Sequence, residues 1–339
     1  MTDRLTVLAM TGFFMLLTGV ACSDSSDSHE MDGKPAAVIF DTDMATDCDD
    51  AGALAMLHAL ERKGEATILA TVVNNKGDHS AGMVAAINAF YGRPGLLTGA
   101  YLGDVVSTEP RPFFAEIAQD TEMYGHTAAT RIGFPDAVEV YRRVLADAGP
   151  SEVVVVSVGH LNNLHDLLQS GPDRYSSLNG MELVRRKVDH LVVMGGHYPS
   201  GREHNFAARE SHRFTGAALD RWPTRILFSG YELGENILTG PALNVLDPSH
   251  PVYRAYADHP SDPLVNGRQS WDQTAVLAAV RNPEFYWDLS GPGRVTVDED
   301  GSNSWVDDPE GRHLYLIERE VPGPEKVASI IGELMGDMP

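Results

Sequence analysis

Short apolar runs alternate with helical patterns along most of this chain, and that alternation limits the fold more than any other feature of the sequence. Five runs suit strands that are buried on both faces, at residues 38–40, 66–73, 153–158, 190–194 and 225–228. Helical patterns separate them, at residues 51–62, 80–91, 136–148, 161–168 and 215–220. The sequence therefore predicts an α/β fold with a doubly wound, mostly parallel open sheet and helices on both of its faces.

The last part of the chain predicts an antiparallel addition to this sheet. Residues 294–306 are typical of a hairpin that turns at Gly301, residues 313–317 of another edge strand, and residues 324–335 of a closing helix. The sequence has no repeat at a fixed period and no long internal linker, so we expect residues 35–339 to form a single domain.

A cluster of five aspartates directly follows the first apolar run, in the segment Asp41-Thr-Asp43-Met-Ala-Thr-Asp47-Cys-Asp49-Asp50. A helical pattern begins next, so the cluster lies at the carboxyl end of a strand, where open α/β sheets place their active sites. Carboxylates this close repel one another strongly in a partly desolvated site, and a hard divalent cation with oxygen ligands is the usual remedy. The segment therefore predicts a metal site, with a solvated acidic loop as the alternative.

The overall charge narrows the class of partner. The chain has 339 residues and a formal net charge of −22. A surface this acidic repels the phosphates of nucleic acids, so we expect no nucleic-acid partner.

The first 34 residues differ in character from the rest. Residues 5–17 are an apolar segment that is too short for a membrane span but suits a signal peptide. The segment up to Cys22 resembles a bacterial lipoprotein signal, which implies a signal peptide at residues 1–21, a lipid on Cys22 and a flexible tether at residues 22–34. We then expect a periplasmic or cell-envelope protein with a lipid anchor in the membrane; secretory cleavage near Ala21 is the alternative.

Polar residues follow the other predicted strands and complete a longer set of motifs. They are Val72-Val-Asn74-Asn75, Gly159-His-Leu-Asn162-Asn163, Met194-Gly-Gly196, Glu203-His-Asn205 and, at the start of a late helix, Trp271-Asp272. Taken in order with the aspartate cluster, they resemble the inosine–uridine-preferring nucleoside hydrolase family over residues 36–339. If the strands are parallel, all these turns lie on one edge of the sheet and can converge on the aspartates.

The resemblance implies a reaction and a cofactor. Members of the family hydrolyse the N-glycosidic bond of ribonucleosides to ribose and a free base, with a water activated on one Ca²⁺. Matching positions imply that Asp43, Asp50, Asp272 and the backbone carbonyl of Val158 bind the ion, and that Asp43 is the general base. The family is usually dimeric or tetrameric, which implies a homodimer or homotetramer.

The same resemblance implies how a riboside substrate is bound. Asp49, Asn75, Glu203 and Asn205 match residues that bind the ribose hydroxyls and the 5′ end. Trp271 stands where the studied branch has a histidine proposed to protonate the leaving base, and we interpret it as a surface on which the base stacks or as a core residue. The aspartate-rich segment that begins at Asp41 is also two residues longer than the form common in the family, and it has an additional aspartate, Asp47.

Simpler interpretations of these residues remain. Asn75 and Asp272 could cap helices, and Glu203 with Asn205 could form a surface turn. Two other functions are also open: a non-catalytic surface lipoprotein that binds a riboside or a metal, and a haloacid-dehalogenase-like phosphatase, in which the first aspartate, Asp41, would be the nucleophile.

Overall fold

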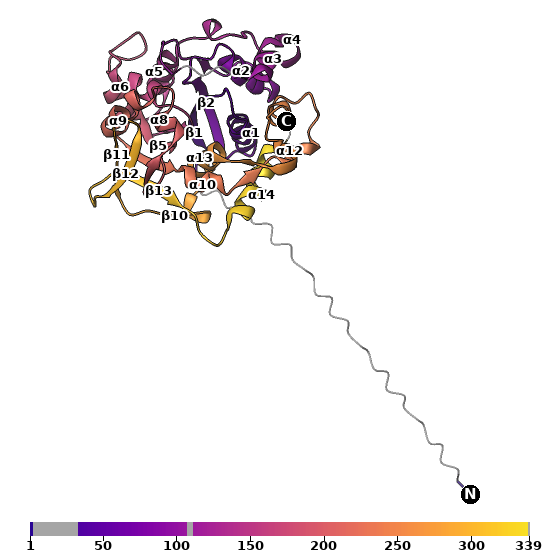
Figure 1. Cartoon of the computed structure of the whole chain (residues 1–339). Helices are drawn as coiled ribbons and strands as arrows, with labels where there is room; N and C mark the ends of the chain where they lie inside the picture. The colour runs from indigo at the N-terminus through magenta and orange to yellow at the C-terminus, as the bar shows by residue number, and fades with distance from the viewer. Residues whose placement is uncertain (3–32, 107–110, 338–339) are drawn as a thin grey trace. The chain divides into compact units, whose positions relative to one another are not determined.

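A large mixed sheet forms the centre of the structure, a computed structural model that describes residues 1–2, 33–106 and 111–337 (Figure 1). The strand order is β3-β2-β1-β4-β5-β7-β13-β11-β12-β6. Its parallel half contains β1 (Ala36–Thr42), β2 (Ala66–Val73), β3 (Thr98–Gly99), β4 (Val153–Ser157), β5 (Val188–Met194) and β7 (Arg225–Ser229). The five predicted strands are all present, and the predicted doubly wound, mostly parallel sheet is confirmed.

Helices cover both faces of this sheet, and Figure 1 shows α1 on one side of β1 with α6 and α9 on the other. Successive residues of a strand point to opposite faces. In β1, Val38 and Phe40 accordingly join one hydrophobic cluster and Ile39 the other. The first cluster contains α1 (Asp49–Arg62), α2 (Ser80–Phe90), α3 (Pro112–Gln119), α11 (Pro251–Ala257), α13 (Trp271–Val280) and α14 (Pro324–Met335); the second contains α5 (Ala137–Asp147), α6 (Asn162–Gln169), α7 (Gly180–Lys187) and α9 (His212–Arg221).

The antiparallel half of the sheet differs from the prediction in one respect. The hairpin is present as β11 (Gly293–Val297) and β12 (Ser302–Asp307), with β6 (Ser200–Arg202) paired to β12. However, β13 (His313–Ile317) is an interior strand, parallel to β7 and antiparallel to β11, so its prediction as an edge strand was wrong. Leu316 packs in one hydrophobic cluster and Tyr315 packs against the other. Because both faces of β13 carry packed side chains, the strand is covered on both faces in an interior position.

Several short elements were not predicted, because they have too few residues to show a periodic pattern. They include α4 (Thr121–Tyr124), α8 (His204–Ala207), α10 (Tyr231–Glu235), α12 (Pro263–Asn266), β8 (Leu238–Thr239), β9 (Arg268–Gln269), β10 (Asp288–Leu289) and the 3₁₀ turns Arg131–Gly133, Pro241–Val245 and Pro283–Phe285, together with α3, α7, α11, β3 and β6. Three of them, α8, α10 and β9, contribute residues to the candidate site.

The predicted signal peptide, Cys22 and most of the tether lie outside the described residues. Residues Lys34–Pro339 form one compact unit. Within the described ranges, no helix is long and apolar enough to cross a membrane.

Candidate active site

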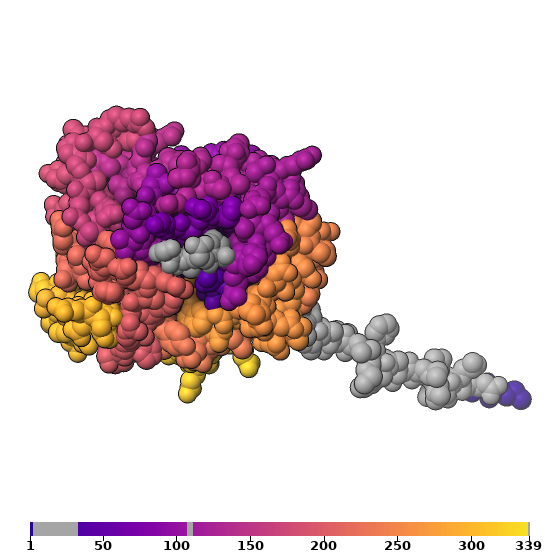
Figure 2. Space-filling view, turned by 45° about the horizontal axis from the view of Figure 1, so that its top comes forward, coloured from indigo at the N-terminus to yellow at the C-terminus, as the bar shows by residue number. Residues whose placement is uncertain are grey.

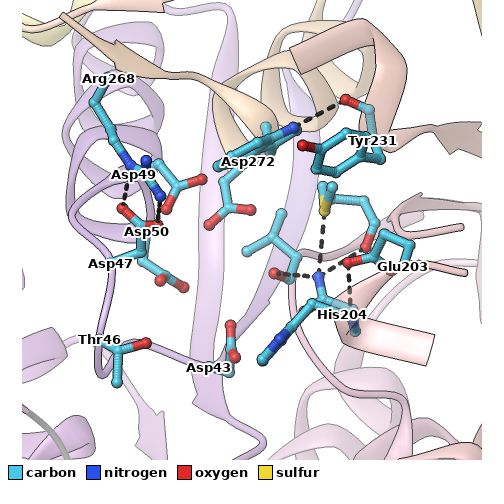
Figure 3. Close-up of a pocket in the computed structure, with 14 residues that line it drawn as sticks. Asp43, Thr46, Asp47, Asp49, Asp50, Glu203, His204, Tyr231, Arg268 and Asp272 are labelled. Carbon is cyan, nitrogen blue, oxygen red and sulfur yellow. Dashed lines mark hydrogen bonds and ion pairs between the residues drawn. The ribbon is translucent and has the colours of Figure 1, made fainter. Parts of the chain in front are cut away.

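A pocket lies where the carboxyl ends of the central strands meet. In Figure 2, segments from the first, middle and last thirds of the chain surround a hollow on one face. The pocket is lined by Asp43, Thr46, Asp47, Asp49, Asp50, Val158, Met194, Glu203, His204, Asn205, Tyr231, Arg268, Trp271 and Asp272 (Figure 3). All the predicted site residues except Asn75 are therefore brought together.

The first aspartate of the cluster, Asp41, has a structural role and does not line the pocket. Its carboxylate is fully buried and accepts hydrogen bonds from Asn74 Nδ2 at 2.9 Å, the Tyr141 hydroxyl at 2.8 Å and Asn163 Nδ2 at 3.1 Å. Burial raises the pKa of Asp41 to about 7, and these three donors oppose that rise. A covalent nucleophile needs access to substrate, so the placement of Asp41 counts against the phosphatase interpretation.

Three other carboxylates, those of Asp49, Asp50 and Asp272, face one another at one end of the pocket. One oxygen from each lies within 4.8 Å of the others, and all three residues are buried (Figure 3). Burial, followed by repulsion from neighbouring carboxylates, raises the pKa of each well above its usual range. The cluster is therefore not a solvated acidic loop. Its oxygen donors and negative charge fit a hard divalent cation such as Ca²⁺.

The other two predicted metal ligands, Asp43 and Val158, also line the pocket. Burial raises the pKa of Asp43 to about 6, and His204 opposes that rise. Asp43 is not part of the group of three carboxylates; its carboxylate instead groups with His160 and His204. The Val158 carbonyl accepts a hydrogen bond from Asn205 Nδ2 at 3.2 Å, so a second lone pair on this oxygen can meet a cation.

Glu203 and Asn205 are buried, so they do not form a surface turn. The Glu203 side chain caps the amino end of α8. Its carboxylate accepts hydrogen bonds from the backbone N–H groups of Gly196 at 3.0 Å and Asn205 at 2.7 Å. Burial raises the pKa of Glu203 to about 7. Asn205 Nδ2 donates to the carbonyls of Val158 and Met194, both at 3.2 Å, and so links the ends of β4 and β5.

Asn75 lies behind the pocket wall, where it supports the loop that carries Asp43. Its Nδ2 donates to the Asp43 carbonyl at 2.7 Å, while its Oδ1 accepts from Gly77 N at 2.6 Å and Ser80 Oγ at 3.1 Å. In this arrangement the side chain acts on the position of Asp43 and is not exposed to the pocket.

Trp271 and Tyr231 form an aromatic wall of the pocket. Their rings stack with centroids 5.4 Å apart, and the indole N–H of Trp271 donates to the Tyr231 carbonyl at 2.9 Å. The Arg268 guanidinium lies 5.1 Å from the Trp271 ring centroid. Trp271 therefore packs within the protein and also faces the pocket.

The additional aspartate, Asp47, forms an ion pair with Arg268. The sequence did not predict Arg268 as a residue of the site. Arg268 Nε donates to Asp47 Oδ1 at 3.0 Å, and its Nη2 makes a second, shorter contact with Oδ2. Although burial favours the protonated acid, these contacts hold the pKa of Asp47 below its usual value. Arg111 Nε fixes the same loop by donating to the Thr46 carbonyl at 2.6 Å. Both arginines are far from the loop in sequence, so no local pattern could reveal them.

No family model and no curated protein sequence matches this chain. Solved structures nevertheless share its architecture. An inosine-guanosine nucleoside hydrolase has 18% identity and a TM-score of 0.63, covering 89% of this chain and 98% of its own. The fold is nucleoside hydrolase-like. An inosine-uridine preferring nucleoside hydrolase from Bacillus anthracis has 14% identity and a TM-score of 0.61, with coverage of 89% and 99%.

A third similar structure is the type III effector protein XopQ complexed with adenosine diphosphate ribose. It has 16% identity and a TM-score of 0.62, and covers 89% of this chain and 94% of its own. At such identities the likeness shows the fold alone, so the expected family resemblance is confirmed at the level of the fold.

Proposed function

We propose that this chain hydrolyses the N-glycosidic bond of ribosides to ribose and a free base, with Ca²⁺ in the pocket. The observation that carries the proposal is the set of buried carboxylates of Asp49, Asp50 and Asp272, which face one another at the carboxyl edge of a nucleoside hydrolase-like sheet. Asp50 and Asp272 from this set would hold the ion together with Asp43 and the Val158 carbonyl, which line the same pocket outside the group of three carboxylates. Bound there, Ca²⁺ would position a water and lower its pKa.

Asp43 would take a proton from that water. A carboxylate beside the water can act as a general base when it is ionised, and a bound cation favours the ionised form of Asp43. The neighbouring carboxylates supply negative charge near the oxocarbenium-like sugar that forms in N-glycosidic cleavage. Asp49 and Glu203 are the pocket residues that accept hydrogen bonds from ribose hydroxyls, and Asn205 lies beside them.

The aromatic wall suits the base of the substrate, because a base can stack on its rings. The indole N–H of Trp271 is bonded to the Tyr231 carbonyl, so this residue does not protonate the leaving base. The leaving base therefore takes its proton from another residue, such as His204 in the pocket lining, or departs without an acid.

Release of ribose from p-nitrophenyl riboside and from a panel of nucleosides tests the proposal. The protein should release ribose in Ca²⁺ and lose this activity in EGTA. Asp43→Asn should lower kcat by about 10²–10⁴-fold, because that is the usual contribution of a general base. Asp166→Asn is the control, because the Asp166 side chain is 41% exposed on α6, outside the pocket lining. Full activity in EGTA, or in Asp43→Asn with Ca²⁺ bound, would contradict the proposal.

A second function, riboside binding without hydrolysis, is favoured by one observation. The residue at the expected position of the leaving-group acid is Trp271, and its indole N–H is used within the protein. One structure of similar fold was solved with adenosine diphosphate ribose, which is a riboside. Calorimetry with adenosine diphosphate ribose and inosine distinguishes the two functions: binding of either compound without ribose release would support this second function.

A further inference from the structure

His160 presents an unpartnered nitrogen to the side of the pocket that carries Asp43. The residue is fully buried in the turn between β4 and α6. Its Nδ1 lies 3.3 Å from the Asn205 carbonyl oxygen. A carbonyl can only accept a hydrogen bond, so Nδ1 carries the proton of the neutral ring and Nε2 is left with a lone pair.

The lone pair of Nε2 has no suitable neighbour. Within the described residues Nε2 has no hydrogen-bond partner, and Asp43 Oδ2 lies 3.5 Å away. A lone pair and a carboxylate oxygen repel each other, and a buried acceptor without a partner costs free energy. A cation between the two atoms would remove both problems.

His204 completes a set of three ligands around this position. Ligand atoms of Asp43, His160 and His204 all lie within 4.8 Å of one another. Figure 3 shows the His204 ring, on the short helix α8, directed toward Asp43. His204 is exposed, so its ring can turn to meet an ion. An ion held by these three ligands would have coordination positions left that face the pocket.

We propose that Asp43, His160 and His204 form a second metal site for a divalent transition metal such as Zn²⁺. Two imidazoles and one carboxylate suit such ions, whereas Ca²⁺ takes oxygen ligands. Zn²⁺ bonds of about 2.0–2.1 Å place two tetrahedral ligands about 3.3 Å apart, close to the 3.5 Å between His160 Nε2 and Asp43 Oδ2. Histidines that bind a metal through one ring nitrogen usually donate a hydrogen bond from the other, which fixes the orientation of the ring. His160 Nδ1 makes such a hydrogen bond to the Asn205 carbonyl.

Titration with Co²⁺, whose visible absorption reports its coordination, tests this site in the full-length protein with Ca²⁺ in excess. The wild type should bind one Co²⁺ that Zn²⁺ displaces. His204→Ala and His160→Gln should each weaken Co²⁺ binding at least about tenfold, because loss of even an outer partner costs about 10–100-fold. His165→Ala, in α6 and outside the pocket lining, should have no effect, and Ca²⁺ binding should persist in His204→Ala.

A second control addresses another cluster, Asp47, Cys48 and His259, whose ligand atoms also lie close together. If only His259→Ala removed Co²⁺, the ion would belong there and the proposal would be wrong. Wild-type affinity in His204→Ala, or no Co²⁺ binding at all, would also overturn it. Loss of Ca²⁺ together with Co²⁺ in His204→Ala would show one shared site instead of two. His204 is exposed, so its variant decides the question even if His160→Gln does not fold.

This site is independent of the proposed reaction apart from the shared Asp43. Neither His160 nor His204 is a proposed Ca²⁺ ligand. Ribose release that depends on Ca²⁺ can therefore persist when the Co²⁺ site is absent, and Co²⁺ can bind where no ribose is released.

Discussion

Asn205 links two strand ends at the centre of the pocket through one amide group. Its Nδ2 donates to the carbonyls of Val158 and Met194, so it fixes the orientation of the carbonyl that we assign to Ca²⁺. Residues that orient metal ligands commonly affect affinity as strongly as some ligands do.

We therefore expect Asn205→Ala to weaken Ca²⁺ binding about 10–100-fold. It should also lower the free energy of unfolding by about 1–3 kcal/mol, because two buried carbonyls lose their donor. Asn244→Ala is the control for Ca²⁺ binding, since the Asn244 amide also donates to two carbonyls, those of Pro241 and Leu264, and is exposed outside the pocket lining. Calorimetric titration with Ca²⁺ measures the first effect; an unchanged affinity in Asn205→Ala would show that Val158 is not a ligand.

Substitution of Trp271 distinguishes stacking of the aromatic wall on the base from a role in packing. Since its N–H is engaged by Tyr231, we expect p-nitrophenyl riboside to be cleaved faster than inosine. Trp271→Ala should reduce kcat/KM more for inosine than for the activated substrate, by the about 1–3 kcal/mol that stacking on a base contributes. Equal losses on both substrates would instead identify Trp271 as a packing residue that holds Asp272 in place.

At the scale of elements, the long β1–α1 loop depends on residues from the far end of the chain. Arg268, in β9, pairs with Asp47 in that loop, and the two side chains are 22% and 26% exposed. When one partner of a partly buried ion pair is removed, the other charge is left unpaired. The free energy of unfolding then falls more than when both partners are removed.

Arg268→Ala should therefore destabilise the protein by about 1–3 kcal/mol. In a double-mutant cycle with Asp47→Ala, the double variant should lose less than the sum of the single variants, with a coupling of about 0.5–3 kcal/mol. Arg213 and Glu210 are the control pair, because their side chains are 56% and 62% exposed. Urea unfolding of the four proteins gives the cycle; strictly additive losses would mean that the pair does not hold the loop.

At the scale of the whole molecule, buried acids make stability depend on pH and on metal. Burial raises the pKa of Asp41 and Glu203 to about 7 and that of Asp43 to about 6. The folded state therefore keeps protons that the unfolded chain has already released. The contribution of these three acids to metal-free stability therefore declines as pH rises from their unfolded pKa values through about 7. Buried histidines act in the opposite direction at acidic pH, because burial lowers the pKa of His58, His160, His250 and His313 to about 4.

Calcium should reverse this decline, because it binds the ionised carboxylates and must displace their protons. We expect Ca²⁺ to raise Tm more at about pH 8 than at about pH 5.5. Thermal unfolding in EGTA and in Ca²⁺ at both pH values measures the effect, with Asp272→Ala as the variant that should not respond. An equal Ca²⁺-induced shift at the two pH values would argue against protonated carboxylates in the metal-free pocket.

The sequence also predicts a membrane anchor at Cys22. In a bacterial host that processes lipoproteins, the wild type should sediment with membranes and incorporate labelled fatty acid. Cys22→Ala should lose the label and leave the membrane fraction, while Cys48→Ala should keep both properties. Soluble, unlabelled wild-type protein would favour the alternative, secretory cleavage near Ala21.

Local patterns in the sequence determined the central strands, the helices between them and the position of the aspartate cluster at a strand end. Runs of β-branched residues and helical periodicity depend only on near neighbours, which is why Ala66–Val73 and Pro324–Met335 were predicted at their observed bounds. Since parallel strands end at one edge, the convergence of Asp50, Val158 and Asp272 on one pocket also followed from the sequence.

Tertiary structure decided which partner each polar side chain has. It placed Asp41 among three buried donors, turned Asn75 toward the Asp43 carbonyl, and paired Asp47 with Arg268 across 221 residues. It also inserted β13 between β7 and β11. Such choices depend on which distant surfaces meet when the layers pack, and the sequence around each residue does not contain that information.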